Sequence, residues 1–374
     1  MAGIYIHIPF CRKRCSYCDF HFSTSFEKYR GDLIRKIGEE IEFRKSELNE
    51  QIDTIYIGGG TPSILAPAEL DLLLNQIFKH YKTTSLDEVT LEVNPEDVDA
   101  NKLTYWKSLG VNRLSIGLQS IKEQDLRWMN RAHAAKDGKD AIRLAAQKGF
   151  NRISADIMYG LPDLTTHQWV DTLEQIVRLP INHISTYCLT VEPKTSLKKN
   201  IATGQLKMPS EESIENQFHL MIDTFVGKGF EHYEVSNFAH PGEESVHNSN
   251  YWKGIPYLGF GPSAHSYDGL RRRWNISNNL SYIKANFSCS DWFESETLSK
   301  ENKWNELFLT GLRARWGVKT TDILEAGGFT ENESERLEYW ETLGCLTLNP
   351  QFISLTNKGM LLADKITQDF FRLT

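Results

Sequence analysis

Short apolar stretches alternate with longer amphipathic stretches over the first 230 residues. The short stretches are rich in β-branched residues without strict apolar–polar alternation, which is typical of strands buried on both faces. The longer stretches repeat apolar residues at helical spacing. The expected strands lie at 3–10, 54–60, 88–95, 113–120, 152–162 and 183–190, and the expected helices at 26–48, 66–81, 99–109, 136–148 and 167–179. Strands that alternate with helices predict a parallel sheet.

Six such units are fewer than the eight of a closed barrel. The pattern therefore predicts an α/β fold, a partial (β/α)6 barrel with an open parallel sheet, with a doubly wound sheet as the alternative. The strands are followed by CRKRC, GGGTP, EVNPE, GLQS, DIMYGLP and YCLTVEP. Because ligand sites of parallel sheets lie at the carboxyl ends of the strands, we expect the functional site among these segments.

The pattern of apolar and polar residues changes twice after residue 230. Residues 231–295 are less regular, with one expected strand at 233–239 and an ordered loop at 247–266. From residue 296 the pattern predicts a small C-terminal α+β domain resembling a winged helix. Its expected elements are helices near 300–315, 320–325 and 330–343, a hairpin at 346–356 and a last helix. The predicted parts are thus 1–230, 231–295 and 296–374.

Composition and charge argue against some classes of function. The net charge of −7 argues against general binding of nucleic acid, which needs a basic face. No apolar run reaches the length of about 18 residues that a membrane span needs, although peripheral contact with a membrane stays open. The N-terminus lacks the pattern of a signal peptide, so we expect a cytoplasmic protein with reduced thiols.

Three of the six cysteines, Cys11, Cys15 and Cys18, lie within eight residues after the first expected strand. A closed zinc site needs four ligands, and no second cysteine pair exists. Three thiolates on a [4Fe–4S] cluster would leave one iron open for another ligand. Cys188, Cys289 and Cys345 occur singly and are expected to be small buried side chains.

The segment Cys11-x3-Cys15-x2-Cys18, with Tyr17 before the last cysteine and GGGTP after the second strand, resembles the signature of radical S-adenosylmethionine (SAM) enzymes. The resemblance covers the whole chain and is to the oxygen-independent coproporphyrinogen III oxidase group, within it the HemW haem chaperone branch. It implies a [4Fe–4S] cluster on the three cysteines, SAM on the open iron and haem as a further ligand. Bound SAM and cluster supply radical chemistry, while the protein orients the reactants and excludes solvent.

The same resemblance implies the residues around SAM. They are Tyr5, Tyr17, Gly59, Gly60, Thr61, Glu92, Gln119, Arg131 and Asp156. The glycines suit close approach of the backbone to a ligand, or form a plain tight turn. Arg131 suits a carboxylate because its guanidinium binds in a bidentate way. Each residue alone is also compatible with a structural role, since polar groups at strand ends cap helices.

The chain departs from the oxidases of this group in two places. Phe20 stands where they carry a fourth cysteine, and the chain begins directly with the first strand. The segment HNSNYW at 247–252 resembles instead the HNxxYW motif of the HemW branch. We therefore expect a haem chaperone, with His247 as a haem contact and Tyr251 and Trp252 on the haem face. Arg271, Arg272 and Arg273 either meet propionates or form a solvated loop.

The resemblance further implies haem-acceptor proteins and an electron donor such as flavodoxin or ferredoxin. It leaves open whether the chain is an enzyme. The alternatives are an oxidase that decarboxylates coproporphyrinogen III and a radical SAM enzyme acting on RNA or a peptide. The latter lacks a basic patch and further cluster cysteines.

Overall fold

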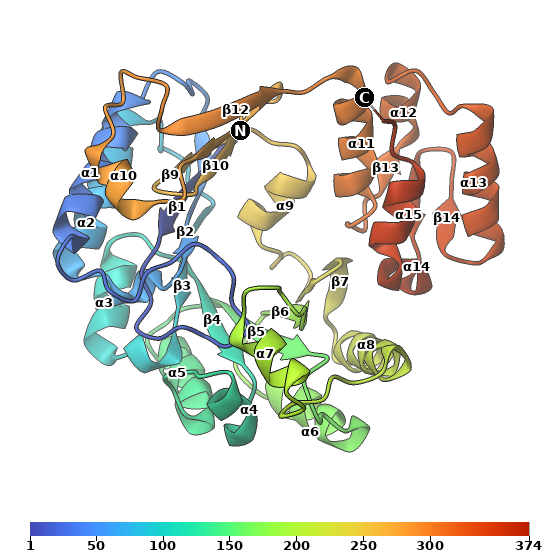
Figure 1. Ribbon diagram of the computed structural model, residues 1–374, viewed down its shortest axis with the longest axis horizontal. Helices are drawn as coiled ribbons and strands as arrows, with labels where there is room; N and C mark the ends of the chain where they lie inside the picture. Colours follow the sequence, from blue (N-terminus) through green and yellow to red (C-terminus); the bar gives the residue numbers. More distant parts are fainter. Residues whose placement is uncertain (374) are drawn as a thin grey trace.

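A computed structural model describes residues 1–373 (Figure 1). Six parallel strands, joined by helices, lie side by side in the order of the sequence. They are β1 (Ala2–Ile8), β2 (Ile52–Gly59), β3 (Glu88–Val93), β4 (Arg113–Gln119), β5 (Arg152–Tyr159) and β6 (His183–Cys188). The six expected strands and the partial (β/α)6 arrangement are confirmed.

Both edges of this sheet carry further strands, so that the whole sheet has twelve strands in the order β12-β11-β10-β9-β1-β2-β3-β4-β5-β6-β8-β7. Strand β9 (Tyr257–Phe260) is parallel to β1, whereas β10 (His265–Tyr267), β11 (Arg271–Asn275) and β12 (Phe293–Thr297) are antiparallel to their neighbours. The sheet as a whole is therefore mixed, while the six expected strands at its centre are parallel. These edge strands are short, with polar or aromatic side chains, so their apolar periodicity is weak.

Helices pack against the outer face of the six central strands (Figure 1). They are α1 (Arg30–Phe43), α2 (Pro67–His80), α3 (Ala100–Ser108), α5 (Ala135–Gln147), α6 (Thr166–Ile176) and α8 (Glu211–Gly227). Two short helices, α4 (Glu123–Trp128) and α7 (Ser196–Ala202), lie next to the loop after β1, since the Ser16 amide bonds to the Met129 carbonyl and the Leu197 amide to the Ser16 carbonyl. Ile4, Ile55 and Leu91 on the strands are fully buried beneath helix residues such as Ile37 and Leu73. Burial of such side chains stabilises the fold by about 1.5–3 kcal/mol each.

The segment after residue 230 is more regular than its sequence indicates. Residues 233–239 form no single strand: β7 (Glu231–Glu234) and β8 (Asn237–Ala239) make an antiparallel pair. Residues 247–266, expected as a loop, contain helix α9 (Val246–Trp252) and strands β9 and β10. Ser245 begins α9, since its hydroxyl accepts a hydrogen bond from the Asn248 amide. Helix α10 (Asn279–Lys284) follows β11.

The C-terminal elements lie beyond α9 from the six central strands (Figure 1). They are helices α11 (Lys300–Gly311), α12 (Thr320–Glu325), α13 (Glu331–Thr342), α14 (Asn357–Leu361) and α15 (Ala363–Asp369), and a small antiparallel sheet of β13 (Val318–Lys319), β15 (Phe352–Leu355) and β14 (Leu346–Leu348). The expected hairpin is present, and the expected last helix is divided in two. The likeness to a winged helix and the three domain boundaries stay predictions. Among residues 1–373, no helix is both long and apolar enough to span a lipid bilayer.

Candidate functional site

A cavity of about 600 Å3 lies at the carboxyl ends of the central strands. Its lining includes every residue predicted to hold the cluster or SAM: Tyr5, Cys11, Cys15, Tyr17, Cys18, Gly59, Gly60, Thr61, Glu92, Gln119, Arg131 and Asp156. These residues come from five strands or the loops after them, as expected for a site at the carboxyl edge of a parallel sheet. Because they line one cavity, they support the prediction that the segments after the strands form a single site.

The three cysteines are half-buried in the loop that follows β1. The loop is fixed at its base, where the Cys11 amide donates a 3.1 Å hydrogen bond to the Ser23 carbonyl. The Thr61 hydroxyl lies 3.5 Å from Cys11 Sγ and Arg131 Nη1 lies 3.7 Å from Cys15 Sγ, each as a donor. In the described residues no three potential ligands form a site for a single metal ion. A cubane cluster does not require one, because each thiolate binds a different iron.

Burial sets the protonation of these thiols. It raises the pKa of Cys11 to about 12 and the pKa of Cys18 to about 11. Both thiols are therefore protonated near neutral pH until a cationic group replaces the protons. Soft thiolates are the ligands that iron–sulfur clusters take, so the donor set fits such a cluster.

The glycines at the end of β2 are required by close packing against β1 and the cysteine loop that follows it. A side chain on Gly60 would lie 2.7 Å from the Phe10 carbonyl oxygen and 3.0 Å from Cys11 Sγ. Gly59 has φ of +113°, and a side chain there would lie 2.8 Å from the His7 ring. Gly59 thus allows close packing on β1, and Gly60 allows close packing on the cysteine loop. The turn brings Thr61 next to Cys11 as a consequence.

Arg131 carries its charge into the cavity. Nη2 donates 2.9 Å hydrogen bonds to Asn94 Oδ1 and to the Gly117 carbonyl. Nε is buried and has no partner among the described residues. A buried donor without a partner is costly, and a bound anionic group would satisfy it. The side chain therefore fits the carboxylate of an amino-acid ligand.

Two half-buried carboxyl groups line the cavity, Glu92 from β3 and Asp156 from β5. Glu92 accepts hydrogen bonds from Tyr56 (2.8 Å) and from the Gly59 amide (3.0 Å), and burial raises its pKa to about 7. Asp156 accepts from Ser115 (2.9 Å) and Ser154 (3.1 Å), and burial raises its pKa as well. Fixed carboxyl groups suit ammonium and ribose hydroxyl groups as partners. Both therefore fit SAM.

Sequence reasoning missed several lining residues. Asn94 orients Arg131, and Tyr187 lines the cavity from the end of β6. The sequence could have indicated both residues, because they lie in EVNPE and YCLTVEP, two of the segments expected at the ends of the strands. Gln119 adopts φ of +62° at the cavity, a strained conformation for a residue other than glycine. Such strain is typical of functional sites.

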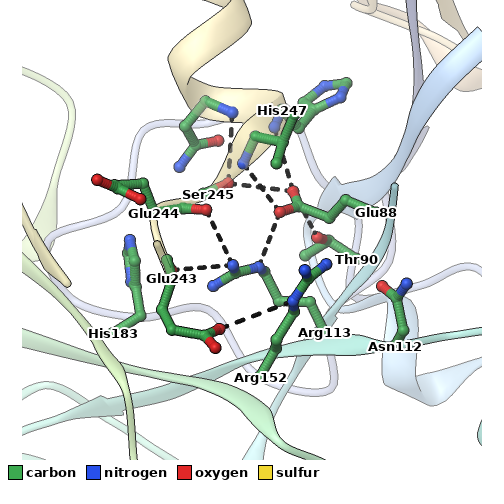
Figure 2. A network of polar contacts seen from close by, with 12 residues as sticks. Glu88, Thr90, Asn112, Arg113, Arg152, His183, Glu243, Glu244, Ser245 and His247 are labelled. Atoms are coloured by element: carbon green, nitrogen blue, oxygen red, sulfur yellow. Dashed lines mark hydrogen bonds and ion pairs between the residues drawn. The ribbon is translucent and has the colours of Figure 1, made fainter. Parts of the chain in front are cut away.

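The haem contact expected of His247 stays a prediction, and the structure places this residue in α9, beside Glu88 (Figure 2). His247 is 2% exposed and does not line the cavity. Its Nδ1 shares a 2.8 Å hydrogen bond with the Thr54 hydroxyl, and its Nε2 shares another with the Tyr251 hydroxyl. Both ring nitrogens are thus engaged, and the ring is stacked on Tyr56. The residue anchors α9 at the opposite, amino-terminal ends of the strands.

The anchor is built around Glu88, the first residue of β3, which is fully buried (Figure 2). Its carboxylate accepts from Arg113 Nε at 2.8 Å and from the amides of Val246 and His247 at 2.9 and 3.2 Å. The negative charge thus satisfies amides of the first turn of α9. Burial alone would raise the pKa of Glu88, but Arg113 and these amides hold it below its ordinary value.

The remaining predictions have mixed outcomes. Arg271–Arg273 belong to β11 and form no loop; Arg273 lies over the rings of Trp292 and Phe293, and Arg272 pairs with Glu306 at 2.8 Å. Cys345 is buried as expected, whereas Cys289 is exposed. Cys188 lines the cavity.

Comparison with known proteins agrees with this geometry. The radical SAM superfamily matches residues 5–176. The heme chaperone HemW of Bacillus subtilis is 33% identical over 98% of this chain and 98% of its own length. The heme chaperone HemW of Escherichia coli is 32% identical over 98% of this chain and 97% of its own length.

Among solved structures, the coproporphyrinogen III oxidase HemN of Escherichia coli matches with a TM-score of 0.84. It is 22% identical, and the match covers 99% of this chain and 89% of that chain. This likeness establishes the α/β fold with its mixed sheet.

The radical SAM superfamily uses a [4Fe–4S] cluster and SAM, and the cavity provides for both. Three thiols fit the cluster, while the unpartnered Arg131 donor and the carboxyl groups of Glu92 and Asp156 fit the charges and hydroxyl groups of SAM. The similarity to the curated relatives extends over nearly the whole chain, including the C-terminal elements. The chain therefore belongs to the HemW family of radical SAM proteins.

Proposed function

We propose that this protein is a haem chaperone, which binds haem and transfers it to acceptor proteins while carrying a SAM-liganded [4Fe–4S] cluster. The similarity to curated heme chaperones along the full chain carries this proposal. The alternative, oxidative decarboxylation of coproporphyrinogen III, has weaker support. The match to the oxidase is one of fold, and Phe20, which is 73% exposed at the rim of the cavity, replaces the oxidases' fourth cysteine.

A haemin titration tests the proposal. Anaerobically reconstituted protein is titrated with haemin and followed by Soret absorbance. We expect saturation at about one haem per chain, as for a specific cargo site. Absence of saturable binding would refute the chaperone function.

We further propose that the residues at each strand end contact a particular part of SAM. Arg131 would bind the carboxylate, Glu92 the amino group or ribose, and Gln119 and Asp156 the ribose. Gly59, Gly60 and Thr61 would face the methionine end, with Tyr5 and Tyr17 packing beside the ligand. The support is that all of them line one cavity with the three thiols.

Loss of these contacts should weaken SAM binding selectively. Arg131→Ala and Asp156→Ala should each lower SAM affinity by roughly 10- to 150-fold, the effect of losing a charged or polar contact of about 1.5–3 kcal/mol. Iron content should stay near that of the wild type, because neither residue ligates iron. Calorimetry with SAM measures the first effect and iron analysis the second. Unchanged SAM affinity in both variants would mean that these residues are structural.

The electron donor would dock at the cysteine loop. Arg12, Lys13 and Arg14 are exposed there, and the first two line the cavity mouth. Cationic side chains next to the cluster favour an acidic carrier such as flavodoxin or ferredoxin, despite the net charge of −7 of the whole chain. Three free thiols at a cluster site also fit the reducing cytoplasm.

A further inference from the structure

A second cavity, of about 730 Å3, lies between the sheet and the C-terminal elements. One wall comes from the end of α9, the start of β9 and strands β10 and β11, and the other from α11, β13 and the start of α12. None of the residues that line it also lines the first cavity. A volume of this size is typical of sites for ligands much larger than water.

The lining of this cavity contains several half-buried aromatic side chains. They are Tyr251, Trp252, Tyr257, Tyr267 and Trp316. The rings of Tyr251 and Tyr257 pack edge to face, 4.6 Å apart. Aromatic rings that line a cavity bind flat conjugated ligands by stacking and edge contacts.

Positive charge dominates the lining of this cavity, on both walls. Lys253, Lys303 and Lys319 make no ion pair with any carboxylate of residues 1–373. Arg272 and Arg313 also line the cavity but pair with Glu306 and Asp364. Since Asp322 is the one other carboxylate of the described wall, three lysines remain for an anionic ligand. This charge is local, because the whole chain is acidic.

The two walls are held in place by contacts beside the cavity. The Val235 amide donates to the Arg313 carbonyl at 2.8 Å, and the Arg315 amide donates to the Tyr233 carbonyl at 2.9 Å. The Arg315 side chain pairs with Glu231 and Glu244. Lys253 lies 5.0 Å from the Trp316 ring and so joins the walls directly. The cavity is therefore part of the fold and not a gap between loose parts.

We infer that this second cavity is the cargo site, holding the flat haem macrocycle against its aromatic wall with the two propionates at Lys253 and Lys319. The inference rests on the proposed function for the identity of the ligand. Stacking and charge provide the binding; among residues 1–373 no histidine, cysteine or methionine lines the cavity, and tyrosine is the one type of haem-iron ligand present there. His247 supports the site without lining it, because its hydrogen bond to the hydroxyl of Tyr251 holds that ring in place.

The test compares two ligands on four proteins. Haemin and its dimethyl ester, which lacks free carboxylates, are titrated into reconstituted wild type, Trp316→Ala, the double variant Lys253→Glu/Lys319→Glu and the control Lys207→Glu/Lys228→Glu. The control changes two exposed lysines outside the cavity. Iron content and thermal unfolding verify that each variant is folded.

We expect the cavity double variant to bind haemin about tenfold more weakly and the ester about as well as the wild type does. Trp316→Ala should weaken both ligands about tenfold through lost stacking. Unchanged haemin affinity in both cavity variants would overturn this site while leaving the chaperone function intact. Equal losses for haemin and ester in the double variant would overturn the propionate assignment. Failure of the wild type to bind haemin would refute the function and the site together.

Discussion

Replacing any one of Cys11, Cys15 or Cys18 by alanine should remove nearly all cluster iron from the reconstituted protein. Three thiolates on one short loop hold three corners of the cluster, so no neighbouring thiol can substitute for a lost one. Wild type should hold about four irons per chain, and its charge-transfer absorption should bleach on reduction with dithionite. Iron and sulfide analysis with visible spectra measures this.

Cys289→Ala is the matched control, because Cys289 is an exposed thiol far along the chain from the loop. It should retain the iron content of the wild type. Cys188→Ala is the sharper comparison, since Cys188 lines the same cavity. If the cluster needed Cys188 as much as the three loop cysteines, the three-ligand site would be wrong.

Glu88→Ala should lower the free energy of unfolding by about 3–5 kcal/mol, the effect of breaking a buried ion pair by removing one partner. The substitution leaves the Arg113 guanidinium and the first amides of α9 without their acceptor (Figure 2). Urea unfolding measures the effect. Glu338→Ala, at an exposed glutamate on α13, is the control and should change stability by at most about 0.5 kcal/mol. A loss below about 1 kcal/mol for Glu88→Ala would show that the pair does not anchor α9.

The carboxyl group of Glu88 should also make the free energy of unfolding depend on pH. The pKa of Glu88 in the folded state lies below its ordinary value of about 4.3. Its stabilisation is therefore complete above that value and is lost as the pH falls through the lower, folded-state pKa. Wild type should lose more stability than Glu88→Gln below about pH 4.

The central strands and the first cavity were predictable because each depends on local sequence. Buried parallel strands read as continuous apolar runs, and the polar residues at their ends share one edge of the sheet. The cysteine spacing and GGGTP added the chemistry. Thus twelve of thirteen predicted site residues line one cavity.

The errors arose where tertiary contacts decide the structure. The segment HNSNYW lacks an apolar stripe, so it was read as a loop, yet Glu88 and Ser245 satisfy its amides and make it helical. The assignment of His247 to haem rests on its position in that motif and stays a prediction. The hydrogen bonds of both its nitrogens, to Thr54 and Tyr251, depend on residues distant in sequence or one helical turn away. Strand β11 was missed for the same reason, because Arg273 is stabilised by the rings of Trp292 and Phe293, which lie just before and at the start of β12.

The central claim is that haem is carried as cargo and that coproporphyrinogen III is not converted. Its most direct test is one anaerobic incubation of the reconstituted protein with SAM, dithionite, haem and coproporphyrinogen III, followed by chromatography and mass spectrometry of the tetrapyrroles. The account predicts intact haem that stays with the protein and unchanged coproporphyrinogen III. Formation of protoporphyrinogen IX with consumption of SAM, and no retention of haem, would contradict it.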